Sequence, residues 1–140
     1  MAKSKRAYPS QVEPRLYRRA NRLRRQLTSG QYVASSDDLD PALVPVREIL
    51  TEFIWGKVWL RPGIDRRTRS FMNLAILIAQ NRQEELVANF GVADKNGLTR
   101  AEIAEAVLHA AAYCGGPAGV RAVALANKYF RECDTKGKKR

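Results

Sequence analysis

Residues 55–61 combine aromatic and basic side chains that suit recognition of a small anion. The segment reads Trp-Gly-Lys-Val-Trp-Leu-Arg and is followed by Pro62-Gly63. Trp55 and Trp59 are four residues apart, so both lie on one helix face and can line a flat cavity, although core packing is the alternative use for either indole. A Pro-Gly turn after that face places Arg61 beside an apolar wall. The segment therefore predicts a pocket for a small planar anion.

The cations of this region each have a chemical and a structural interpretation. Lys57 can pair with a carboxylate, donate a proton or form a Schiff base if it is desolvated, or it is a solvated surface lysine. Arg61 can clamp a carboxylate through two hydrogen bonds, or it satisfies helix carbonyls and pairs with Asp65. Neighbouring arginines point away from each other on a helix, so at most Arg66 or Arg69 joins Arg61 at one pocket.

A second set of candidate residues lies later in the chain. His109 is the only histidine, and histidine is the side chain that ordinarily changes charge between about pH 5 and 8. On an alanine-rich helix the alternative interpretation is a packed core residue. Tyr113 and Cys114 follow one turn later, in the segment that we expect near the cavity. Cys114 has no evident base beside it and packs alternatively as a small apolar group.

Helical periodicity of the apolar residues runs through most of the chain, and no stretch alternates as a strand would. The sequence predicts an all-α, single-domain bundle of about six helices. The predicted helices cover residues 14–27, 41–60, 65–81, 83–95, 101–113 and 117–131. The helix over residues 65–81 is apolar almost all round, so we expect it to be the central buried helix.

Capping residues mark several of the helix ends. Ser29-Gly30 is a helix stop, and residues 35–41 form a polar loop that caps the next helix. Asp65 is suited to an N-cap, and Gly97 to the left-handed position after a helix. The segment Thr99-Arg100-Ala101-Glu102 has the spacing of a capping box.

Charge is distributed unevenly along the 140 residues, whose net charge is +11. Residues 1–30 hold nine Lys and Arg against one Glu, and residues 128–140 hold six against two Asp and Glu, whereas the middle is nearly neutral. Basic ends can bind polyanions or membranes but are more often simply solvated. We therefore predict no nucleic-acid or membrane partner. The helix over residues 14–27 also lacks the turn-linked second helix that a DNA-binding interpretation needs.

The domain organisation follows from these patterns. We predict a disordered basic arm over residues 1–13, a helical domain over 14–132 and a disordered basic tail over 133–140. The Arg-rich start is alternatively a mitochondrial presequence. Two cysteines without a Cys-x-x-Cys spacing argue against a disulfide framework, thiol exchange or zinc, and the longest apolar run falls far short of the roughly 20 residues that span a bilayer. We expect a cytoplasmic protein.

Three motifs in this order resemble the carboxymuconolactone decarboxylase family. They are WGKVWLRPGIDRRTRS at 55–70, KNGLTRAEIAEAV at 95–107 and AAAYCGGPAGVRA at 110–122. The segment Gly30-Gln31-Tyr32-Val33 is also similar to the opening of that family, so we favour a structural first helix over a presequence. The resemblance covers roughly Arg15 to Ala126.

This resemblance implies an AhpD-like, all-helical subunit that assembles as a trimeric or hexameric ring, with active sites between helices near the subunit contacts. It implies decarboxylation of a small lactone carrying carboxylates, without a metal or an organic cofactor. Thiol peroxidase-type members of the family carry a Cys-x-x-Cys and a nearby histidine, which are absent here.

Two positions depart from the decarboxylase pattern. The family usually has glutamate where this chain has Lys57, and a histidine where it has Asn89. Asparagine cannot exchange protons near neutral pH, but its amide can hydrogen-bond a developing enolate. The candidate catalytic residues are therefore Lys57, Asn89 and His109, and the predicted substrate is a small anionic carbonyl compound or lactone other than the usual one. The alternative is a catalytically degenerate member that serves as a ligand-binding or assembly subunit.

Overall fold

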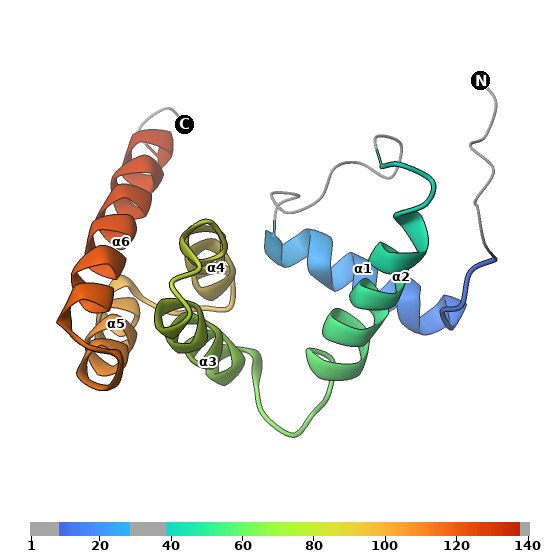
Figure 1. The fold of residues 1–140 in the computed structure, drawn as a ribbon, viewed down its shortest axis with the longest axis horizontal. Coiled ribbons are helices and arrows are strands. Elements are labelled where there is room, and N and C mark those ends of the chain that lie inside the picture. The colour runs from blue at the N-terminus through green and yellow to red at the C-terminus, as the bar shows by residue number, and fades with distance from the viewer. Residues whose placement is uncertain (1–8, 29–38, 138–140) are drawn as a thin grey trace. The chain divides into compact units, whose positions relative to one another are not determined.

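The computed structural model describes residues 9–28 and 39–137, and within them the chain is helical without any strand (Figure 1). The predicted all-α class is confirmed. The elements are α1 (Pro14–Thr28), α2 (Val44–Thr51), the π-helical segment η1 (Glu52–Val58), α3 (Arg66–Ala79), α4 (Gln83–Lys95), α5 (Arg100–Cys114) and α6 (Gly116–Gly137). Among these helices, none is both long and apolar enough to cross a bilayer.

Several predictions concern residues outside the described ranges. They are the helix stop at Ser29-Gly30, the family-like segment through Val33, the loop at residues 35–38 and the outermost parts of the two basic ends. The described chain forms two compact units, residues 1–63 and residues 64–140. The prediction of one domain over residues 14–132 concerns how these units are joined, and it stays a prediction.

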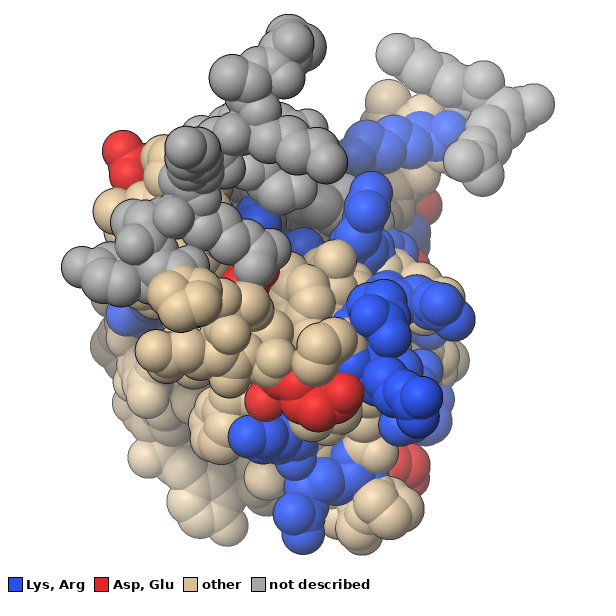
Figure 2. Space-filling view, turned by 90° about the vertical axis from the view of Figure 1, so that its right-hand side faces the viewer, with Lys and Arg blue, Asp and Glu red and all other residues tan. Residues whose placement is uncertain are grey.

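In unit 1, helix α1 packs its apolar stripe inward. Ala20, Leu23 and Leu27 are buried, as the helical spacing predicts. The approach of α1 to η1 is close at Gly56, because a Cβ added there would lie 3.0 Å from Leu16 Cγ and 3.3 Å from Ala20 Cβ. The other faces of α1 carry exposed arginines, and Figure 2 shows Lys and Arg side chains gathered along one side of the face in view.

The predicted helix over residues 41–60 is two segments of different winding. Helix α2 begins at Val44, and from Glu52 onward the backbone hydrogen bonds run from residue i+5 to residue i, as from Trp59 N to Ile54 O at 2.9 Å. Such π-helical turns are rare and often occur at functional sites. The chain then turns through the exposed Pro62-Gly63, as predicted.

Unit 2 contains α3 to α6 around a core centred on Leu74, Phe90 and Ile103, each at most 1% exposed. Helix α3 is buried along one face only. Met72 and Ile76 are about half exposed, at 51% and 48%, so the prediction that this helix is buried almost all round is wrong for unit 2 by itself. Helix α3 therefore has more apolar side chains than the core of unit 2 buries.

Helix α6 differs from the prediction at its C-terminal end. It continues to Gly137, whereas the apolar periodicity predicts an end near Arg131, and residues 133–137 are helical where a disordered tail is predicted. One physical reason is the contact of Asp134 with Arg100 of α5, at 2.6 Å between carboxylate and guanidinium, which holds the last turns against the neighbouring helix.

The predicted caps are confirmed at α3, α4 and α5. Asp65 accepts a hydrogen bond from Thr68 N at 2.7 Å, and Gly97 follows α4 with a positive φ of 87°. At α5, Glu102 N donates to Thr99 Oγ1 at 3.2 Å and Thr99 N donates to Glu102 Oε2 at 2.7 Å, which completes the capping box. Each of these ends is thus set by local chemistry.

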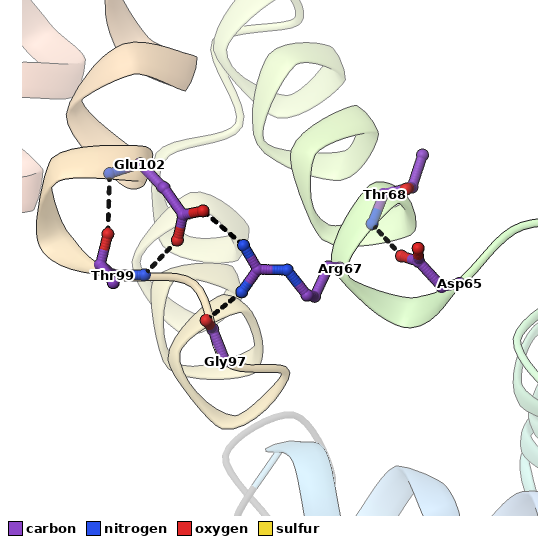
Figure 3. A network of polar contacts seen from close by, with 6 residues as sticks. All are labelled: Asp65, Arg67, Thr68, Gly97, Thr99 and Glu102. Atoms are coloured by element: carbon purple, nitrogen blue, oxygen red, sulfur yellow. Dashed lines mark hydrogen bonds and ion pairs between the residues drawn. The ribbon is translucent and has the colours of Figure 1, made fainter.

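Arg67 joins the capping box of α5 to helix α3 (Figure 3). Its guanidinium donates to Gly97 O and to the Glu102 carboxylate. Hydrogen bonds from Thr99, and then the Arg67 guanidinium, hold the pKa of Glu102 below its usual range. Arg67 therefore fixes the α4–α5 corner through contacts within unit 2.

Candidate functional site

The two tryptophans of unit 1 form a stacked pair. Their ring centroids are 5.2 Å apart with an interplanar angle of 28°. Trp59 is 5% exposed and belongs to the core, whereas Trp55 is partly exposed. The two indoles therefore share one helix face, as predicted, but only Trp55 presents surface to a ligand in this unit.

Lys57 lies beside a buried carboxylate that the sequence analysis does not identify. Its ammonium is 3.2 Å from Glu52 Oε1, and the Lys57 side chain is 58% exposed against 9% for Glu52. The other carboxylate oxygen of Glu52 accepts a hydrogen bond from Glu13 N at 2.6 Å. A carboxylate that is removed from water needs such partners, and Lys57 and the Glu13 N–H provide them for Glu52.

A second buried carboxylate, Glu48, lies one turn before Glu52 and is 4% exposed. It accepts a hydrogen bond from Ser10 Oγ at 3.0 Å. Both glutamates face inward although acidic residues on helices are ordinarily solvated. Their spacing was the sequence signal for this burial. Glu48 and Glu52 are four residues apart, so they share one face of the predicted amphipathic helix, and apolar residues follow each of them.

Arg61 is exposed at the end of this segment, where its backbone N–H donates to Val58 O at 3.1 Å. It follows the aromatic face in unit 1, as predicted. Its role as a clamp for a substrate carboxylate stays a prediction.

In unit 2, Asn89 is held by a pair of side-chain amides between α3 and α4. Asn73 Nδ2 donates to Asn89 Oδ1 at 3.2 Å, and Asn89 Nδ2 donates to Glu85 O at 2.9 Å. Arg69 lies one turn before Asn73 on the same face of α3 and is partly buried. Arg69 and Asn89 are candidates from the sequence, whereas Asn73 is not; its signal is that it is the one polar residue between Phe71 and Ala79.

His109, Tyr113 and Cys114 lie at the C-terminal end of α5 and are all exposed in unit 2. The rings of His109 and Tyr113 are in contact, with centroids 5.0 Å apart. The alternative interpretation of His109 as a packed core residue is wrong for this unit, because α5 buries Ile103, Ala106, Val107 and Ala110 and turns the histidine outward.

An apolar groove of about 460 Å³ runs between α5 and α6. Its floor is made of small residues, and Gly119 is the closest point, because a Cβ added there would lie 2.4 Å from Ala111 Cβ. Leu108, Val120 and Val123 form exposed walls. This groove contains none of the predicted site residues and has no cationic lining, which differs from the predicted anion pocket.

The structure thus places the predicted residues in three local groups. Unit 1 holds Lys57 in contact with Glu52, in the segment that also carries the stacked indoles, and unit 2 holds the amide pair of Asn89 and a separate aromatic contact at His109. The first group has an ammonium and a carboxylate in contact, which is the chemistry of proton transfer or carboxylate binding. Within the described residues, no three His, Cys, Asp or Glu side chains are arranged to hold a metal ion.

Comparison with known proteins adds the family context. The family model of the carboxymuconolactone decarboxylase family matches residues 45–128, from α2 into α6. The nitrosuccinic acid decarboxylase of Metarhizium robertsii is 37% identical over 128 residues, which cover 91% of this chain and 90% of the relative. The 4-carboxymuconolactone decarboxylase of Acinetobacter baylyi is 32% identical over 117 residues, covering 83% of this chain and 87% of the relative.

Proposed function

The chain belongs to the carboxymuconolactone decarboxylase family and is decarboxylase-like, and from this membership we propose that it decarboxylates a small anionic acid through the acid/base chemistry of its own side chains. The observation that carries the proposal is the similarity to two decarboxylases along more than four-fifths of this chain. Both relatives are named for acids, a nitro-substituted succinic acid and a carboxylated lactone. The shared requirement is a carboxylate whose departing electron pair is accepted by a neighbouring electron-withdrawing group.

The proposed reaction breaks one carbon–carbon bond. The bond between the carboxylate carbon and the substrate breaks, carbon dioxide leaves, and the electron pair is delocalised into the nitro or carbonyl group. As this bond breaks, the ammonium of Lys57 stabilises the developing negative charge and delivers a proton to the carbanion carbon, and the neutral amine regains a proton from water. No oxidant or reductant is needed, because the substrate carboxylate and one proton give carbon dioxide and the protonated product.

Other predicted residues have binding roles in this proposal. Trp55 offers an exposed aromatic face to a flat substrate, and Arg61 and Arg69 are the candidates for pairing with carboxylates. Asn89 can donate a hydrogen bond to a developing anion without titrating. Tyr113 and Cys114 stay candidates for substrate contact, and His109 for proton transfer.

The substrate is proposed to differ from the usual family lactone. Lys57 replaces the glutamate of the family pattern and Asn89 replaces the histidine, so the charges offered to the substrate are changed. A lysine adds a positive charge where the family pattern has a negative one, which favours a substrate with an anionic group at this place, such as an open-chain dicarboxylic acid bearing an electron-withdrawing group. The identity to the nitrosuccinic acid decarboxylase, 37% against 32% to the lactone decarboxylase, supports a substrate of this kind.

A substrate panel tests the proposal. Purified protein is incubated with nitrosuccinic acid, 4-carboxymuconolactone and a β-keto dicarboxylic acid, and carbon dioxide release is followed above the rate in buffer. We expect turnover of at least one acid and a preference for an open-chain dicarboxylic acid over the cyclic lactone. If folded protein releases no carbon dioxide from any acid but binds one of them in calorimetry, the alternative of a degenerate ligand-binding subunit is favoured instead.

Self-association as a trimer or hexamer is part of the proposal. Unit 1 exposes a row of large apolar side chains along α2 and η1, and unit 2 exposes the walls of its α5–α6 groove. Exposed apolar surface of this extent is typical of an interface. The exposed residues of the row are Leu43, Val46, Ile49, Leu50, Phe53 and Ile54. Light scattering measures the mass, and a clean monomer at micromolar concentration would contradict assembly.

A further inference from the structure

The winding of η1 brings together two side chains that an α-helix would separate. Glu52 and Lys57 are five residues apart. In an α-helix, five residues correspond to a rotation of about 140° beyond a full turn, so the two side chains would point to different faces. In η1 the hydrogen bonds join residues five apart, which stacks residue 57 over residue 52. The observed Lys57–Glu52 contact of 3.2 Å therefore depends on the π-helical winding.

We infer that Glu52 is a positioning residue that fixes the ammonium of Lys57 for proton delivery, and that the π-helical segment exists in this chain to build this pair. The inference rests on the proposed function, since it assigns to Glu52 a role in the same reaction. Glu52 itself is 7% exposed and therefore acts through Lys57 and not on the substrate.

Glu52 is itself rigidly held, which is what a positioning residue requires. Its Oε2 accepts the hydrogen bond from Glu13 N at 2.6 Å, directly before α1, and its Oε1 faces Lys57 Nζ. One carboxylate oxygen is thus held by a backbone N–H, and the other contacts the Lys57 amine. A long exposed lysine otherwise samples many rotamers, and the loss of that freedom has to be compensated by a fixed partner.

The neighbouring Glu48 provides a matched comparison within the same interface. It is as buried as Glu52 and one turn away, but the described hydrogen bond of its carboxylate goes to Ser10 Oγ. If the buried carboxylates served only to hold the structure together, Glu48→Gln and Glu52→Gln would be expected to affect the Lys57 amine alike. Only Glu52 is in contact with the amine of Lys57, so the two glutamates are expected to differ in their effect on that amine.

The first test measures the amine directly and needs no substrate. Native protein is treated briefly with an amine-acylating reagent, and modification of Lys57 is quantified by mass spectrometry relative to the exposed Lys128 on α6. We expect Glu52→Gln to raise the relative rate at Lys57 about two- to five-fold, because the ion pair no longer holds the ammonium. Glu48→Gln should leave the ratio unchanged. Equal Lys57 rates in wild type and Glu52→Gln would overturn the inference.

The second test is a double-mutant cycle on catalysis. With the acid that the panel identifies, Glu52→Gln is expected to lower kcat about tenfold or more with little change in KM, since a misplaced proton donor slows the chemical step. In a Lys57→Gln background, which removes an exposed side chain and should fold, the same change at Glu52 should cost nothing further. An equal loss in both backgrounds would show a structural role only and would contradict positioning.

The two tests separate the inference from the function on which it rests. If no acid is turned over but Glu52→Gln still releases the amine of Lys57, the proposed function fails while the pairing stands. If an acid is turned over and the cycle is additive, the function stands and the role of Glu52 is wrong. Circular dichroism of each variant against wild type shows that the fold is intact before either comparison is made.

Discussion

Replacing Lys57 with glutamine should lower kcat by about 10²- to 10⁴-fold, the usual contribution of a positioned general acid. Lys57 is 58% exposed in its side chain, so the substitution leaves no cavity and the fold should survive. Because the ammonium acts on the negative charge that develops in the transition state of carbon–carbon cleavage, kcat and kcat/KM should fall together. Steady-state kinetics with the acid identified by the panel measures this effect, with Lys128→Gln as the control for loss of one exposed positive charge.

Replacing Lys57 with glutamate is the more discriminating change. The family resemblance implies a glutamate at this position, so similarity alone predicts that the variant keeps or gains activity. The structure predicts the opposite, because Glu52 Oε1 already lies 3.2 Å from the present amine and a second carboxylate there would place two like charges together. We expect activity no higher than that of Lys57→Gln. Wild-type turnover by Lys57→Glu would contradict the role given to the pair.

Replacing Gly119 with alanine should destabilise unit 2 by about 1–3 kcal/mol through overpacking, in spite of the better helix propensity of alanine. The added Cβ would lie 2.4 Å from Ala111 Cβ and 3.5 Å from its Cα, so α5 and α6 would have to move apart. Because α5 carries His109 and α6 forms one wall of the apolar groove, the displacement should widen that groove as well. Urea unfolding measures the change in free energy.

The matched control is Gly91→Ala in the middle of α4. A Cβ added at Gly91 meets only Tyr129 Oη at 3.7 Å, which is an ordinary contact. This variant should therefore be stabilised by up to about 1 kcal/mol, since alanine replaces glycine inside a helix. Opposite signs for the two substitutions are expected, and a loss of stability of equal size at Gly91 would mean that the close approach at Gly119 is not the cause.

The helix ends were predictable because their causes are local. Asp65, Gly97 and the pair Thr99 and Glu102 each act on backbone groups within four residues, so residue types at short spacing are sufficient evidence. The end of α6 was not predictable in this way. It depends on the contact between Arg100 and Asp134, which are 34 positions apart in the chain.

The π-helical winding of η1 could not be predicted from the apolar pattern. Ile54 and Val58 are four residues apart, a spacing that places two side chains on one face in either an α-helical or a π-helical winding, so the apolar pattern does not distinguish the two. The contact between Glu52 and Lys57 was hidden because α-helical spacing treats residues five apart as non-neighbours. The candidate residue Lys57 could be selected from the sequence, but its partner could not.

The polar contacts inside the units were hidden for a different reason. Sequence patterns assign polar residues on helices to solvent, whereas Glu48, Glu52 and Ser70 are all less than 10% exposed. Asn73 likewise pairs with Asn89 across two helices, which only the packing of α3 on α4 can bring about. For His109 the error was the opposite one, because the core interpretation buried a side chain that is exposed. An alanine-rich helix has too weak an apolar stripe to show which face is buried.

The central claim is that this chain removes carbon dioxide from a small acid with Lys57 as the proton donor. The most direct measurement compares wild type with Lys57→Gln on a panel acid labelled with ¹³C in the departing carboxylate, following ¹³CO₂ by mass spectrometry in deuterated water. We predict stoichiometric ¹³CO₂ and one deuterium in the product with wild type, and ¹³CO₂ release slowed at least about 100-fold in the variant. Equal rates of ¹³CO₂ release from the two proteins would contradict it.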